Sequence, residues 1–91
     1  MTDTSEATGE PGELFAVGDW GVWKEQEGML DQIGLEERRR AYGEGPFCFE
    51  EVRETKFESV LGHPQMVSFF LEEGNPLSIR TLSGKWFTHA K

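Results

Sequence analysis

The first strand pattern lies in LFAVGDWGVWKE, which mixes aromatic and β-branched side chains around two glycines. Gly18 and Asp19 suit a turn or a bulge, after which Trp20 and Val22 alternate onto one face. Trp20 and Trp23 are an odd number of residues apart, so a regular strand cannot direct both into a core. We expect one indole to be buried and the other to be covered by a loop or left exposed.

The second strand pattern follows a Gly-Pro breaker in GPFCFEEVRETKF. Phe47 and Phe49 alternate, whereas the next apolar residue, Val52, is out of phase with them. One extra residue near Glu50 and Glu51 would return Val52 to the core face, as a β-bulge does. We therefore predict a single bulged strand here.

Three more strands are predicted in QMVSFFLEE, LSIRTL and KWFTH. A loop with Gly and Pro separates the first two, and Ser83-Gly84 is a hairpin signal before the last. The last three strands should therefore form a meander, with Leu77 and Ile79 directed inward. The expected core consists of Phe47, Phe49, Val67, Phe69, Leu71, Ile79 and one of Trp86 and Phe87, whose neighbour faces out.

One helix is predicted, in GLEERRRAYGEG between the first two strands. Glu36 and Glu37 lie near its start and the arginines toward its end, which suits the helix dipole. Gly43 is a natural stop. The preceding GMLDQI supplies apolar anchors, but Gly34 leaves its continuity with the helix open.

These elements predict a small antiparallel sheet that closes on itself. On VGDWGVW, GPFCFEEV and LSGKWF, the chain resembles the SH3-like small barrels of the KOW and Tudor type, over Phe15 to Thr88. It is also similar to small uncharacterised bacterial and bacteriophage proteins of that shape. The resemblance implies a mainly β fold: a five-stranded SH3-like barrel with one short inserted helix, as a single domain over residues 14–91. The acidic-aromatic loop with which signalling SH3 domains bind polyproline is absent.

Charge is unevenly distributed along the 91 residues, whose net charge is −8 from 17 acidic and 9 basic side chains. The opening MTDTSEATGEPGE, residues 1–13, carries four of the acidic residues and no basic one. It contains too little apolar surface to offset its ordering entropy, so we predict a disordered acidic tail. The acidic balance argues against general binding to nucleic acid or membranes.

Residues with catalytic or metal-binding chemistry are few. Cys48 is the single cysteine, and His63 and His89 have none of the spacings of known metal sites. Neither a phosphate-binding glycine loop nor a distinguishable acid/base pair is present. We expect no metal, no cofactor and no enzymatic activity. Lacking a disulfide pair, a signal peptide and a membrane span, the protein is expected in the cytoplasm.

Binding is the remaining class of function. Large rings are enriched at interfaces, and the arginine run is the most concentrated positive charge. The candidate binding residues are Trp23, Tyr42, Trp86, Arg38, Arg39 and Arg40. The leading hypothesis is a noncatalytic interaction module, or an accessory subunit of a bacterial or phage assembly, that binds a protein partner through exposed aromatics or a sheet edge. An acidic nucleic-acid mimic or inhibitor and a nucleic-acid-binding barrel are the alternatives.

Overall fold

Six strands form two three-stranded antiparallel sheets in the computed structural model, which describes residues 13–90. The first sheet has the order β3-β2-β7 and consists of β2 (Trp20–Trp23), β3 (Phe47–Cys48) and β7 (Phe87–His89). The second has the order β4-β5-β6 and consists of β4 (Glu51–Glu54), β5 (Gln65–Phe70) and β6 (Ile79–Ser83). The helices are α1 (Met29–Tyr42) and α2 (Glu58–Leu61), with 3-10 turns η1 (Pro76–Ser78) and η2 (Gly84–Trp86).

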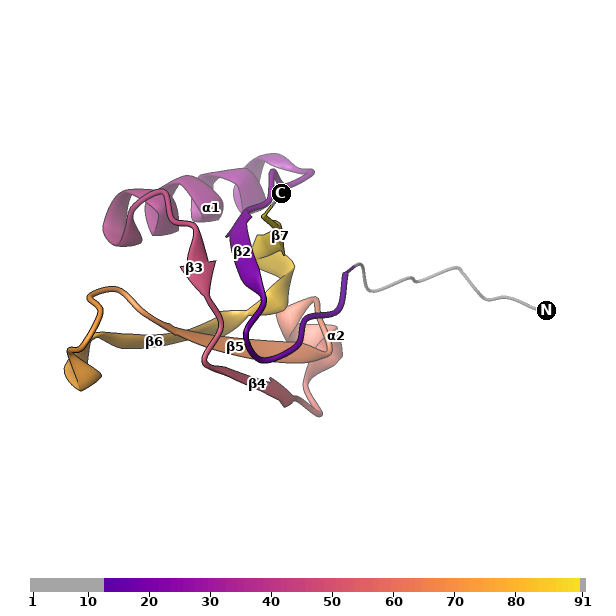
Figure 1. The fold of residues 1–91 in the computed structure, drawn as a ribbon. Coiled ribbons are helices and arrows are strands. Elements are labelled where there is room, and N and C mark those ends of the chain that lie inside the picture. The colour runs from indigo at the N-terminus through magenta and orange to yellow at the C-terminus, as the bar shows by residue number, and fades with distance from the viewer. Residues whose placement is uncertain (1–12, 91) are drawn as a thin grey trace.

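The sheets do not close on one another, so the predicted five-stranded SH3-like barrel is wrong, and helix contributes as much as strand to the described residues. In Figure 1 the β4-β5-β6 sheet lies at the bottom, α1 crosses the top, and β2, β3 and β7 stand between them. The prediction of a single short helix is also wrong, because α1 spans 14 residues.

The predicted bulge near Glu50 is in fact a break between strands. Phe49 donates its amide hydrogen to the carbonyl of Asp19 at 2.9 Å, beside the first sheet. Glu50, the next residue, donates to the carbonyl of Ser68 in the second sheet at 2.7 Å. The chain therefore changes sheets between these two residues, and the phase shift before Val52 marks this crossing.

The predicted meander is wrong as well, because β7 pairs with β2 and not with β6. The 3-10 turn η2 separates them, and the Ser83 hydroxyl caps it by accepting a 3.2 Å hydrogen bond from the Lys85 amide. A turn of this kind breaks the alternation of a strand. Trp86 and Phe87 are consequently both buried, at 9% and 1% exposure, and the prediction that one faces out is wrong.

Helix α1 begins at Met29 and contains Gly34, so GMLDQI does continue into the helix. A β-carbon at Gly34 would lie 3.3 Å from the indole of Trp86, so the glycine permits a close approach of helix and ring. The predicted stop is confirmed: Gly43 has a φ of 92° and donates its amide hydrogen to the carbonyl of Arg39 at 2.8 Å.

Aromatic rings from both sheets make up most of the core. Phe47, Phe49, Val67 and Phe69 are buried as predicted. Phe69 of β5 lies 4.5 Å from Phe47 and 5.5 Å from Phe87 between ring centroids, so rings of the two sheets contact one another directly. Of the other expected core residues, Leu71 is partly buried and Ile79 is exposed. Leu77, which was also predicted to point inward, is exposed as well, because it lies in η1 and Ile79 follows directly after it.

Candidate functional site

Trp20, at the start of β2, is the exposed one of the three tryptophans, with 54% of its surface accessible. Gly21 and Trp23 are the buried residues of β2, and alternation along the strand therefore turns Trp20 outward. Its backbone is fixed on both sides: Trp20 pairs with Cys48, and its carbonyl accepts a 2.9 Å hydrogen bond from the amide of Ala90. An exposed indole thus sits on a fixed backbone.

A groove of about 430 Å³ lies beside this indole, a volume within the range of ligand pockets. We call it the Trp20 groove; it is lined by Trp20, Pro46, Phe47, Cys48, Glu50, Phe70, Leu71, Glu73 and Gly74. These residues come from β2, β3 and β5, from the segments on either side of β3, and from the loop after β5. The crossing of the chain from one sheet to the other thus places aromatic and acidic side chains around one cavity.

The loop that forms one wall of the groove, residues 72–78, is tied by its own side chains. The Asn75 side chain donates to the Glu72 carboxylate at 2.7 Å and accepts from the Leu77 amide at 3.0 Å. The Ser78 hydroxyl is 3.0 Å from both the backbone carbonyl and the backbone amide of Glu72. This wall is therefore formed before any ligand binds.

Cys48 is the only thiol of the chain, and it lies in the groove. Burial raises the pKa of the thiol above its usual value, and the negative charge of Glu50 raises it further. Cys48 is therefore protonated at neutral pH and is a poor nucleophile. The groove is suited to binding rather than to thiolate chemistry.

The sequence-predicted site residues Trp23 and Tyr42 lie together, but inside the molecule. Trp23 is 6% exposed, stacks on Phe87 at a centroid distance of 4.9 Å, and donates its indole hydrogen to the carbonyl of Gly43 at 2.6 Å. Tyr42 is half-buried, with its ring 6.5 Å from that of Phe69. These rings join α1 to the two sheets and leave Trp20 as the exposed indole.

Arg38 and Trp86, two further candidates, contact each other. The guanidinium carbon of Arg38 lies 4.2 Å from the centre of the Trp86 ring, and the Lys85 ammonium lies 4.7 Å from it. Arg38 also donates to the carbonyl of Gly34 at 3.0 Å. The indole and the two cations thus hold α1 against the turn before β7.

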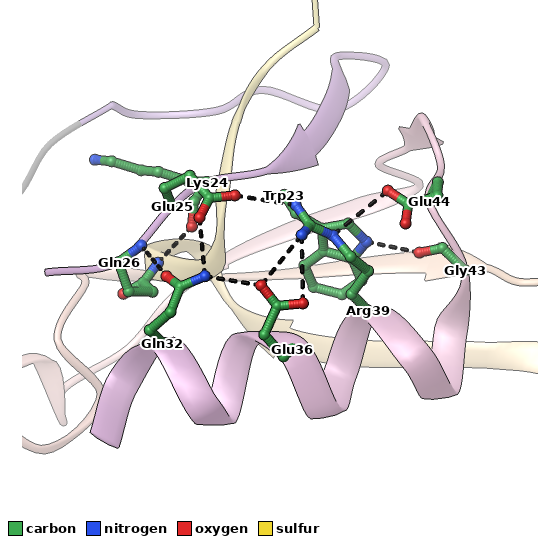
Figure 2. A network of polar contacts seen from close by, with 9 residues as sticks. All are labelled: Trp23, Lys24, Glu25, Gln26, Gln32, Glu36, Arg39, Gly43 and Glu44. Atoms are coloured by element: carbon green, nitrogen blue, oxygen red, sulfur yellow. Dashed lines mark hydrogen bonds and ion pairs between the residues drawn. The ribbon is translucent and has the colours of Figure 1, made fainter. Parts of the chain in front are cut away.

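Arg39 is surrounded by carboxylates, as Figure 2 shows. Its guanidinium lies 3.2 Å from Glu25, 3.3 Å from Glu36 and 3.4 Å from Glu44. The contact with Glu44 brings opposite charges together, although the Nε of Arg39 makes no hydrogen bond within the described residues. The hydrogen bond to Glu25 is the largest cause that raises the pKa of Arg39 above its usual value. The network ties the loop before α1 to the helix.

The arginine run does not form one basic surface. Arg38 covers Trp86, Arg39 is paired with carboxylates, and Arg40 is exposed to solvent. Consecutive residues of a helix point in different directions, which explains these three environments. Among the six predicted site residues, the structure brings together Trp23 with Tyr42 and Arg38 with Trp86.

His89 joins the N-terminal segment to β7. Its Nδ1 lies 2.6 Å from the Glu13 carboxylate and its Nε2 lies 3.1 Å from that of Asp19. We call Glu13, Asp19 and His89 the N-terminal clamp. Hydrogen bonds from Thr88 and then from His89 lower the pKa of Glu13 to about 2, and the Glu13 hydrogen bond is the largest cause that raises the pKa of His89.

His63 and Gln65 tie the same segment to the second sheet. The buried His63 ring accepts from the Gln65 amide at 3.1 Å and donates to the Glu13 carbonyl at 2.7 Å. Gln65 bonds through its side chain to the backbone of Phe15, at 2.8 Å and 3.0 Å. Both histidines are therefore structural ties. The predicted tail covered residues 1–13; residues 1–12 lie outside the described part of the chain, whereas Glu13 is described and makes these contacts.

Two classes of site are not found between residues 13 and 90. No group of three or more His, Cys, Asp or Glu side chains there has the arrangement of a metal site. None of the helices in the same range has the length and apolar character that crossing a bilayer requires.

Sequence reasoning missed the Trp20 groove and the N-terminal clamp. The odd spacing of Trp20 and Trp23 predicted that they face opposite ways, and the burial of neighbouring Gly21 tells which is inside. Gly21 is a signal that the sequence did offer, because a glycine inside a strand marks the close approach of another group. Glu13 carried no comparable signal, since it ends an acidic stretch.

Comparison with models of protein families finds no match to this chain. Curated proteins and solved structures likewise give no match. A function for this chain must therefore follow from its own residues and their geometry.

Proposed function

We propose that this protein is a noncatalytic interaction module that binds a protein partner through the Trp20 groove, in the cytoplasm and as an accessory part of a larger assembly. The observation that carries the proposal is the exposed indole of Trp20 beside a pre-formed cavity. Tryptophan is enriched among the residues that dominate binding energy at interfaces. Exposure of this ring on a folded surface has a free-energy cost that a partner would remove.

Other features of the surface support this choice. Helix α1 also exposes apolar side chains, those of Met29, Leu30 and Ile33. None of the three lines the Trp20 groove or either of the two other main cavities. Of the arginines on which a nucleic-acid-binding function would rely, Arg38 and Arg39 already have partners within the chain. The groove therefore combines exposure, a concave shape and fixed walls.

Affinity capture from an extract of the source cells tests the proposal. The bait proteins are the wild type, Trp20→Ala, and Val60→Ala as a matched control, because Val60 is an exposed apolar residue of α2 outside the groove. Quantitative mass spectrometry should find a protein that the wild type and Val60→Ala retain and that Trp20→Ala loses. If every protein retained by the wild type is also retained by Trp20→Ala, the groove is not the binding surface.

A further inference from the structure

Trp86 and Trp20 differ in what surrounds the indole. Two cations of the chain, Arg38 and Lys85, already lie over the ring of Trp86. Lys85 is also 3.4 Å from the Asp31 carboxylate, so its charge is compensated within the molecule. No cation lies over the ring of Trp20 in the described part of the chain. Trp20 is 54% exposed, and among the described residues its indole has no cationic partner, so a cation from a partner protein is a suitable ligand for the ring.

The rim of the Trp20 groove is acidic. Among residues 13–90, Glu50 and Glu73 are its charged lining residues, and no lysine or arginine in that range lines it. Both carboxylates are exposed, and neither forms an ion pair with another residue of the described chain. The Glu50 charge reaches the groove wall, since it contributes to the raised pKa of the Cys48 thiol. An anionic ligand would be repelled here and a cationic one attracted.

We propose that the Trp20 groove binds a basic peptide segment of the partner, in which a lysine or arginine side chain is adjacent to an apolar one. The cation lies on the indole of Trp20 and pairs with Glu50 and Glu73, while the apolar side chain contacts Phe70 and Leu71. This inference rests on the proposed function and adds the chemistry of the partner. The net charge of −8 supports it, since an acidic protein attracts basic segments over a distance.

A linear segment fits the groove better than a flat protein surface does. A cavity of about 430 Å³ accommodates one or two side chains, and its walls are fixed by strand pairing and by the loop of residues 72–78. Because these walls are already fixed, only the segment itself has to be ordered when it binds.

A phage-displayed library of random peptides supplies the probe. The library is selected on immobilised wild-type protein, and phage that bind the empty support are removed. We expect the selected peptides to be enriched in lysine or arginine next to an apolar residue. Enrichment of acidic peptides, or no peptide that depends on the protein, would overturn the inference.

The strongest selected peptide is then synthesised and titrated into four proteins by calorimetry. They are the wild type, Trp20→Ala, Glu50→Gln/Glu73→Gln, and the control Glu37→Gln/Glu54→Gln, which changes the net charge equally at exposed carboxylates outside the groove. Thermal melting of each protein shows that it is folded. The groove double variant should bind about tenfold more weakly, and the control should bind as the wild type does.

The outcomes separate this inference from the proposed function. If Trp20→Ala weakens binding and the groove double variant does not, the partner segment is not selected by its charge, and the groove still binds it. If both double variants weaken binding equally, the attraction belongs to the whole acidic molecule and the inference fails. If Trp20→Ala binds as the wild type does, the proposed function fails together with the inference.

Discussion

Gly21 is the residue that fixes which tryptophan of β2 is exposed. Any β-carbon at this position would collide with the ring of Phe49, so glycine is the residue that lets β2 lie against the core there. Trp23 follows Gly21 on the buried face, and Trp20 is left outside. The odd spacing of the two indoles in the sequence predicted that they lie on opposite faces of the strand, but spacing alone does not say which face is buried.

Gly21→Ala should therefore destabilise the fold by about 1–3 kcal/mol, the usual cost of adding a methyl group to a filled core. Denaturant unfolding measures this free energy. In a Phe49→Leu background the colliding ring is absent, and the same substitution should cost clearly less. An equal cost in both backgrounds would show that Phe49 is not the obstacle.

His89 makes the stability of the fold depend on pH. The folded pKa of His89 is raised above 6.5, so its stabilisation is fully present below pH 6.5 and is lost as the pH rises through the folded value. The folded pKa of Glu13 is lowered from 4.5 to about 2, so its stabilisation is present above pH 4.5 and is lost as the pH falls toward 2. Both contributions are present together between pH 4.5 and 6.5.

In His89→Asn, melting temperatures should fall below those of the wild type most strongly at about pH 6, and the difference should shrink at alkaline pH. Differential scanning fluorimetry across the pH range provides the measurement. A difference between the two proteins that stays constant over this range would contradict the charged contact of His89 with Glu13 and Asp19.

Helix α1 is held in place by two kinds of side-chain contact, a cation stacked on an aromatic ring and a group of ion pairs. Trp86 with Arg38 holds one part of the helix, and Arg39 with its three carboxylates holds the loop before it. The stop of this helix at Gly43 could be predicted from the sequence, since a glycine after a basic turn is a local signal. The start of the helix could not be predicted, because Gly34 interrupts the helical pattern. This glycine is explained by its packing against Trp86, which is distant in the sequence.

Arg39→Gln should destabilise the fold by about 1 kcal/mol or less, since its carboxylate partners are largely exposed and solvent screens such pairs. Arg40→Gln is the matched control and should have no measurable effect, because Arg40 is exposed and has no ion pair within the described residues. Urea unfolding at low and at high salt would compare them. The destabilisation caused by Arg39→Gln should shrink at high salt. A loss of unfolding free energy that does not depend on salt would show that Arg39 stabilises the fold through packing and not through its charge.

The two sheets of the molecule are joined through aromatic rings rather than through a continuous ladder of hydrogen bonds. Phe47, Phe49, Val67 and Phe69 could be predicted as core because strand alternation is a local property. The open arrangement could not, since it depends on which strand β7 pairs with. A hairpin signal at Ser83-Gly84 favoured β6, and the 3-10 turn η2 instead carries the chain to β2.

Phe69→Ala should cost about 3–5 kcal/mol, because the ring is fully buried and contacts aromatic rings of both sheets. Leu77→Ala provides the control, since this side chain is 86% exposed and should have almost no effect. Chemical denaturation of both variants gives the two free energies. Similar stabilities for the two would place Phe69 outside the core.

Photo-cross-linking from a residue that lines the Trp20 groove tests whether a partner binds there. A benzoylphenylalanine replaces the exposed lining residue Glu73 in one protein and Val60 in another, so that both keep the Trp20 indole, and both are irradiated in the source cells. Position 73 should yield a cross-linked partner that position 60 does not. Adducts from position 60 alone, or the same adducts in equal yield from both positions, would contradict binding in the groove.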